Sequence, residues 1–150
     1  MKEKMKLYFN ERKDLSNKPI IDDFYLCYGR RIDNIMLSNT YSIIVVSDEI
    51  LKAIITSNCN EINDFLNKKM NSFIEDFEHY NYEKITLYLK EEKKYLYCDN
   101  SDKYCFDKYK IRHIESIIGK TGVYYLNSDE RILMVKGKKG YAFLLGCIIH

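Results

Sequence analysis

Two segments of the chain repeat apolar residues at the three- and four-residue spacing of an amphipathic helix. The longer one covers residues 61–79, follows the suitable N-cap Asn60, and carries Asp64 near the positive end of the helix dipole. Its apolar positions fall on one side: Ile62, Phe65, Leu66, Met70, Phe73 and Phe77. The pattern predicts a helix that faces the core, with a partner-binding stripe as the alternative.

The second segment, residues 108–118, follows Asp107 and ends at Gly119. A carboxylate at the N-cap and a glycine after the last turn are usual boundaries of a helix. The inward positions are all isoleucines: Ile111, Ile114, Ile117 and Ile118. A shorter helix capped by Ser47 is predicted over residues 48–55, although an apolar run of this length is also compatible with a strand.

Short apolar runs between polar turns predict strands. These runs are residues 7–9, 24–28, 32–37, 41–46, 85–89, 95–98, 122–126, 131–135 and 140–149. The second, third and fourth runs follow one another through short turns, which indicates an antiparallel meander. The chain shows no linker and no repeat, so we expect one α+β domain over residues 1–150. Its antiparallel sheets would pack against helices 61–79 and 108–118.

The hairpin of residues 85–89 and 95–98 sorts its side chains by period two. If Leu96 and Cys98 extend the buried face of the first strand, its tyrosines lie together on the opposite face. Rigid, amphipathic tyrosines are typical of protein interfaces. The predicted protein-binding residues, including two that precede the hairpin, are Tyr80, Tyr82, Tyr88, Tyr95 and Tyr97. The alternative is that both faces of this sheet are covered.

Composition narrows the class of protein. The 150 residues suffice for a hydrophobic core, and their excess of Lys, Ile, Asn and Tyr is typical of a low-GC bacterium, a phage or a mobile element. No apolar stretch has the length of a signal peptide or a membrane span. The five cysteines are odd in number and scattered, which indicates reduced thiols. We therefore expect a cytoplasmic protein of the bacterial host, without a membrane partner.

Charge is divided along the chain behind a formal total of +2. Residues 61–92 carry −4, whereas residues 103–150 carry +5. The near-neutral total argues against a DNA-mimicking inhibitor and against a dedicated nucleic-acid-binding protein. The basic third keeps a nucleic-acid partner possible, with a solvated lysine surface as the alternative. The candidate nucleic-acid-binding residues are Lys108, Lys110, Arg112, Lys136, Lys138 and Lys139.

Motifs for catalysis or cofactor binding are incomplete. Residues 119–122 read Gly-Lys-Thr-Gly, but the earlier glycine of a phosphate-binding loop is missing and a strand is expected to follow. Cys98, Cys105 and His113 offer zinc-type ligands at a spacing that matches no common zinc site, and His113 is expected on a helix surface. The sequence therefore predicts no catalytic residue, no metal and no cofactor.

One family resemblance covers residues 105–149. A helix begins after Cys105-Phe106-Asp107, three strands follow the helix, and the last strand begins Gly140-Tyr141. This order resembles the closing half of a bacterial or phage sliding-clamp domain. The resemblance implies a DNA-associated protein of which several copies close a ring. Clamps usually end the last strand with Pro and Arg, where this chain has Gly-Cys-Ile.

These observations favour a non-enzymatic protein-binding module. Its expected partner is another protein, either a host complex or a second copy, and its expected role is that of an inhibitor or modulator of a host defence protein. A clamp-like, nucleic-acid-associated protein is the first alternative. A small enzyme without a recognisable motif is the second.

Overall fold

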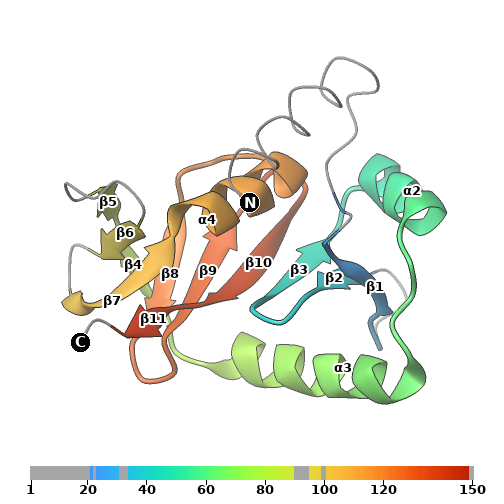
Figure 1. Cartoon of the computed structure of the whole chain (residues 1–150), viewed down its shortest axis with the longest axis horizontal. Coiled ribbons are helices and arrows are strands. Elements are labelled where there is room, and N and C mark those ends of the chain that lie inside the picture. Colours follow the sequence, from blue (N-terminus) through green and yellow to red (C-terminus); the bar gives the residue numbers. More distant parts are fainter. Residues whose placement is uncertain (1–20, 22, 31–33, 90–94, 99–100, 149–150) are drawn as a thin grey trace.

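The computed structural model describes residues 21, 23–30, 34–89, 95–98 and 101–148, except for the side chains of residues 101–104 and 147–148. Within that part, two antiparallel sheets and three helices confirm the predicted α+β class (Figure 1). In chain order the elements are β1 (Tyr25–Tyr28), β2 (Ile35–Ser38), β3 (Ser42–Val46), α2 (Glu49–Asn58), α3 (Asp64–His79), β4 (Glu83–Ile85), β5 (Leu87–Leu89), β6 (Tyr95–Cys98), β7 (Ser101–Asp107), α4 (Lys108–Ile118), β8 (Tyr124–Asn127), β9 (Ile132–Lys136), β10 (Gly140–Leu145) and β11 (Cys147–Ile148). The predicted strand at residues 7–9 lies outside the described residues.

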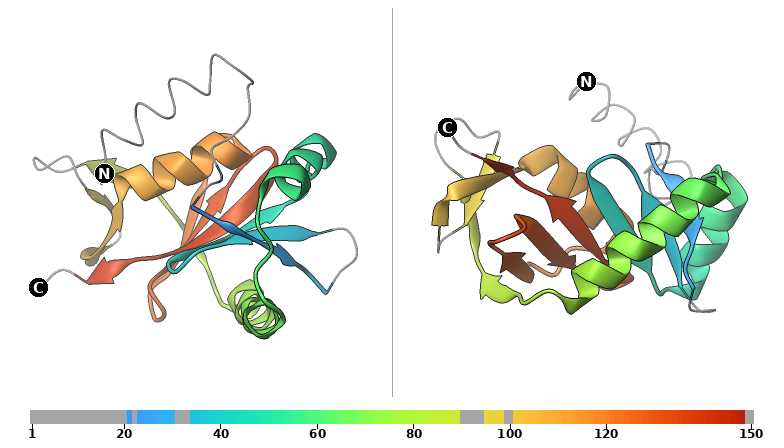
Figure 2. Two further views of the ribbon diagram at one scale, coloured as in Figure 1. Left: turned by 45° about the vertical axis from the view of Figure 1, so that its right-hand side comes forward. Right: turned by 90° about the horizontal axis from the view of Figure 1, so that it is seen from below.

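The larger sheet separates two layers of helices. Its strand order is β1-β2-β3-β10-β9-β8-β4, and β1, β2 and β3 form the predicted meander. Helices α2 and α4 cover one face and α3 crosses the other (Figure 2). The main core lies on the α4 side, where Leu51 and Ile55 of α2 join the isoleucines of α4. None of the helices among the described residues has both the length and the apolar character needed to cross a membrane.

Two strand segments pass from the larger sheet into the smaller one, whose order is β11-β7-β6-β5. The predicted strand over residues 85–89 is divided after Ile85 into β4 and β5, and the predicted strand over residues 140–149 is divided at Gly146 into β10 and β11. A side chain at Gly146 would place its Cβ 2.8 Å from the ring of Phe106. The glycine therefore lets the chain change sheets directly against a buried aromatic ring.

Helix α4 agrees with its predicted boundaries. The carboxylate of Asp107 accepts hydrogen bonds from the backbone nitrogens of Tyr109 (2.9 Å) and Lys110 (3.3 Å), and Gly119 ends the helix with φ +88°. All four predicted inward isoleucines are buried. The predicted surface position of His113 is wrong. Its ring is buried, 5.3 Å from the ring of Phe24, because the isoleucine face of α4 is wide enough to include it.

Helices α2 and α3 both begin later than predicted. The side chain of Asp48, and not that of Ser47, caps α2 by accepting from the nitrogen of Leu51. The predicted cap of α3, Asn60, instead pairs with the edge of the sheet. Its carbonyl accepts from the nitrogen of Leu26 (2.8 Å), and the carbonyl of Leu26 accepts from the nitrogen of residue 62 (3.0 Å). The chain thus runs beside β1 before α3 starts, with Asn63 as its cap.

The side chains of Asn67 and Asn71 continue this cover along the edge of β1. The nitrogen of Tyr28 donates to Oδ1 of Asn67 (2.9 Å), and the carbonyl of Tyr28 accepts from Nδ2 of Asn67 (3.2 Å) and of Asn71 (2.9 Å). The nitrogen of Arg30 donates to Oδ1 of Asn71 (3.0 Å). Two amides one helical turn apart therefore satisfy an edge strand as a neighbouring strand would. This explains why Asn71 is the buried residue of α3.

Candidate protein-binding groove

Helix α3 buries only a narrow part of its apolar surface. Met70, Ile74 and Phe77 pack against the second core cluster on β1, β2 and β3. Phe65 is 74% exposed and Phe73 is 37% exposed, so the prediction that both face the core is wrong. The reason is geometric, because the Asn67–Asn71 side of the helix is held against β1 and turns the phenylalanines outward. Helix α3 thus presents more apolar surface than the sheet covers.

Two hollows lie where α3 passes the turn between β2 and β3. One has a volume of about 480 Å³ and extends past Tyr25, and the other has a volume of about 380 Å³ and extends past Phe73 towards Leu145. Both are lined by Met70 and by the turn residues 39–41, so they lie on either side of that turn. We call the two hollows together the α3 groove.

The turn between the hollows is held by one side chain. Oδ1 of Asn39 accepts hydrogen bonds from the nitrogens of Tyr41 (3.1 Å) and Ser42 (2.8 Å) and from the hydroxyl of Ser42 (2.9 Å). Nζ of Lys110, on α4, lies 3.8 Å from the centre of the Tyr41 ring, which is cation–π distance. The turn is therefore fixed from within and from α4, and the groove is present before any partner binds.

Aromatic rings form the floor of the second hollow. Phe77 lies 5.6 Å from buried Phe143 of β10 and 6.1 Å from Phe73, with centroid distances typical of attractive ring pairs. Tyr80 lies 6.0 Å from Phe77. The hydroxyl of Tyr82 donates to the carbonyl of Phe77 (2.6 Å), and burial, together with Tyr80 and Glu78, raises the pKa of Tyr82. These contacts fix the C-terminal end of α3 to the sheet.

The rim of the groove is acidic. Asp23 lines the first hollow, and Asp76 and Glu130 line the second. No lysine or arginine is among the described residues that line either hollow. Partial burial, followed by the charges of Glu130 and Asp76, raises the pKa of Tyr80. The two carboxylates thus act on the same phenol, which places their negative charges at one end of the groove.

The five tyrosines predicted from the sequence do not form one surface. Tyr80 lines the groove and Tyr82 packs beside it against Phe143, whereas the other three lie on the smaller sheet. There, Tyr88 pairs with Tyr97 at a ring distance of 6.0 Å, as the period-two argument predicts. The expected exposure of Tyr97 is wrong, because β6 lies between β5 and β7 and leaves this side chain 6% exposed. Tyr95 is half-buried and Tyr88 is exposed.

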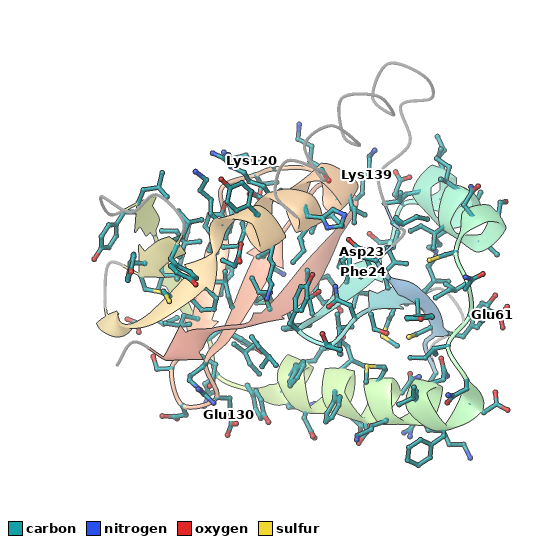
Figure 3. All side chains as sticks on the ribbon, in the orientation of Figure 1. Asp23, Phe24, Glu61, Lys120, Glu130 and Lys139 are labelled. Atoms are coloured by element: carbon teal, nitrogen blue, oxygen red, sulfur yellow. The ribbon has the colours of Figure 1, made fainter. Side chains whose placement is uncertain are left out.

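The six predicted nucleic-acid-binding residues are also divided. Lys108, Lys110 and Arg112 belong to α4, whereas Nζ of Lys136 lies 5.3 Å from the ring of Tyr141 on the opposite face of the sheet. Lys138 and Lys139 lie against the end of α4, where the nitrogen of Lys139 donates to the carbonyl of Ile118 (2.8 Å). Lys120 is not among the six predicted residues, but it comes directly after Gly119, the residue that ends α4. Figure 3 shows Lys120 and Lys139 at the top of the molecule and Glu130 at the bottom.

Clusters of metal-binding side chains are missing from the described residues. Within the described part of the chain, no three His, Cys, Asp or Glu side chains lie close enough to hold a metal ion. The buried carboxylate of Glu115 accepts from the hydroxyl of Tyr124 (2.8 Å). Burial and this hydrogen bond raise the pKa of Tyr124. The pair joins α4 to β8 and faces neither hollow of the groove.

Comparison with known proteins leaves the function open. No protein-family model, curated protein or solved structure matches the chain. The resemblance of residues 105–149 to a sliding-clamp domain therefore stays a prediction. The groove is not visible in the sequence, because its first hollow depends on Tyr25 and on the turn, which join α3 only through folding. The available signal in the sequence was the number of phenylalanines in the helical pattern, of which Phe65 and Phe73 are exposed.

Proposed function

We propose that the protein is a non-enzymatic protein-binding module and that the α3 groove is its contact surface. The observation that carries the proposal is the group of exposed apolar side chains around two preformed hollows. Tyr25 is 52%, Phe73 37% and Leu145 49% exposed, and each lines the groove. Large apolar side chains left exposed around a depression are typical of protein-binding sites. Because these exposed apolar side chains lie together, they favour the α3 groove as the contact surface over the five predicted tyrosines, which lie on two separate parts of the structure.

The role of an inhibitor or modulator of a host defence protein remains a prediction from composition. The groove supports the broader class, because its walls are apolar and aromatic and its polar groups lie at the rim. Interfaces have the same arrangement, with an apolar centre and a polar border. A cytoplasmic location likewise stays a prediction.

Affinity capture tests the proposal. The full chain, used as bait in a lysate of the organism that encodes it, should retain a specific partner, and the double variant Phe73→Ser/Leu145→Ser should reduce its recovery at least about tenfold. Loss of two central apolar contacts commonly costs this much affinity. Ile50→Ser is the matched control, because Ile50 is 76% exposed on α2 and does not line the groove. Equal recovery by the double variant and the control, or no specific partner, would contradict the proposal.

A nucleic-acid-associated function is the second candidate, favoured by the gathering of Lys120, Lys138 and Lys139 at the end of α4. If this corner binds DNA or RNA, the affinity should fall steeply with salt because bound phosphates release counterions. Lys138→Glu/Lys139→Glu should then abolish gel shifts at low salt, whereas Lys68→Glu on α3 should not. Absence of any shift at low salt with the wild-type chain would exclude this function.

A further inference from the structure

We propose that the α3 groove binds a basic, apolar segment of its partner protein, in which lysine or arginine residues flank large apolar side chains. This inference rests on the proposed function and names the chemistry of the partner. Its basis is the combination of an apolar floor with a rim on which all the charged lining residues that the structure describes are carboxylates.

The carboxylates are available to a partner. Among the described residues, the side chains of Asp23, Asp76 and Glu130 form no ion pair, in contrast to Glu75, which pairs with Arg30 (3.5 Å), and Glu49, which pairs with Lys52 (2.9 Å). A cation arriving at the rim therefore meets carboxylates that no described lysine or arginine already pairs with. An acidic segment would meet like charges at both hollows, and this repulsion would act against its binding.

The positions of the charges match a segment that spans the groove. Asp23 lies at the first hollow, Asp76 and Glu130 lie at the second, and the turn at residues 39–41 separates the two. Apolar side chains would enter the hollows on either side of the turn, and basic side chains would extend to the rim. Met70 lines both hollows, and its flexible thioether can adapt to side chains of different shape.

A group of the described cationic residues lies away from the groove. Lys108 and Arg112 of α4, together with Lys120, Lys138 and Lys139, lie on the opposite side of the larger sheet from α3 (Figures 1 and 3). Lys110 of α4 instead has its Nζ 3.8 Å from the ring of Tyr41, which lines both hollows. Helix α3 itself carries Lys68 and Lys69, neither of which lines a hollow. Nζ of Lys69 lies 6.0 Å from the ring of Phe73.

Methyl NMR of the full chain, labelled at its methionine methyl groups, tests this inference. The probe is an 18-residue amphipathic peptide of leucine and lysine, compared with the same peptide carrying glutamate in place of lysine. We expect the leucine–lysine peptide to shift the Met70 signal in a saturable manner and to shift Met134, which pairs with Phe143 but does not itself line the groove, less than Met70. The leucine–glutamate peptide should leave Met70 unshifted at the same concentrations.

Isosteric variants separate charge from shape. Asp76→Asn/Glu130→Gln should weaken binding of the leucine–lysine peptide by about threefold to tenfold, since each rim pair contributes modestly in partly exposed surroundings. Glu49→Gln, a change in an exposed carboxylate on α2, should leave the affinity unchanged.

Two results would overturn the inference: equal shifts of Met70 with both peptides, or no shift with the leucine–lysine peptide. Neither result would decide the proposed function, which is tested separately by comparing Phe73→Ser/Leu145→Ser with Ile50→Ser in affinity capture. If the double variant no longer retained the partner and either of these peptide results were obtained, the groove would still be the contact surface, but its ligand would not be a basic segment.

Discussion

Gly140→Ala should lower the free energy of unfolding by at least about 4 kcal/mol, or prevent folding altogether. Gly140 begins β10 and pairs with Val46 of β3 near the middle of the larger sheet. A Cβ at this position would lie 2.0 Å from the carbonyl oxygen of Val45, and no rotation relieves a clash with backbone. The substitution therefore separates β10 from β3, whose residues contribute to both core clusters.

The measurement is urea denaturation followed by circular dichroism. Gly122→Ala is the matched control, because Gly122 has φ +73° but no atom lies within 4 Å of its added Cβ. Left-handed backbone alone should lower the free energy of unfolding by about 1–2 kcal/mol. Similar decreases in the free energy of unfolding for Gly140→Ala and Gly122→Ala would show that β10 does not lie close enough to β3 for the added methyl group to clash.

Asn71→Leu should lower the free energy of unfolding by about 2–4 kcal/mol, because it removes buried hydrogen bonds while preserving side-chain volume. Nδ2 of Asn71 donates to the carbonyls of Tyr28 (2.9 Å) and Asn67 (2.9 Å), and Oδ1 accepts from the nitrogen of Arg30 (3.0 Å). Leucine leaves the nitrogen of Arg30 without this acceptor and removes one of the two amide donors to the carbonyl of Tyr28. Since Asn71 holds α3 against β1, the variant also loosens one wall of the α3 groove.

The same denaturation experiment checks this prediction, with Lys68→Leu as the control. Lys68 is exposed on the same helix, so its replacement should change the free energy of unfolding by no more than about 0.5 kcal/mol. If Asn71→Leu were as stable as Lys68→Leu, the amides of α3 would not be what holds the helix to the edge of the sheet.

The fold was predictable wherever a local signal decided it. Helix α4 agrees with its prediction because Asp107, four isoleucines and Gly119 supply its cap, inward face and end in one short segment. The predicted start of α3 was wrong because Asn60 and Asn63 are equally suitable N-cap residues in the sequence. In the structure the backbone of Asn60 is hydrogen-bonded to the edge strand β1, and Asn63 caps the helix. A contact between segments so far apart in the chain leaves no local pattern in the sequence.

The candidate site was less predictable. The helical stripe predicts a core face, with partner binding as the alternative, and the structure divides the stripe, with Phe77 packed against the sheet and Phe65 exposed. Hydrophobic periodicity identifies the apolar face of a helix but not how much of it the sheet covers. Likewise, the alternation of side chains along a strand predicts that Tyr88 and Tyr97 share one face. It does not predict that Tyr97 is buried, because this depends on the strands on both sides of β6 in the smaller sheet.

Photo-crosslinking in cells of the organism that encodes the protein tests the central claim most directly. A benzophenone amino acid replaces Phe73 in the groove or, in a separate variant, Tyr88 on the smaller sheet, two aromatic residues that are both 37% exposed. The account predicts a specific protein adduct from position 73 and none from position 88. An adduct from position 88 without one from position 73 would contradict it and assign the contact to the tyrosines of the smaller sheet.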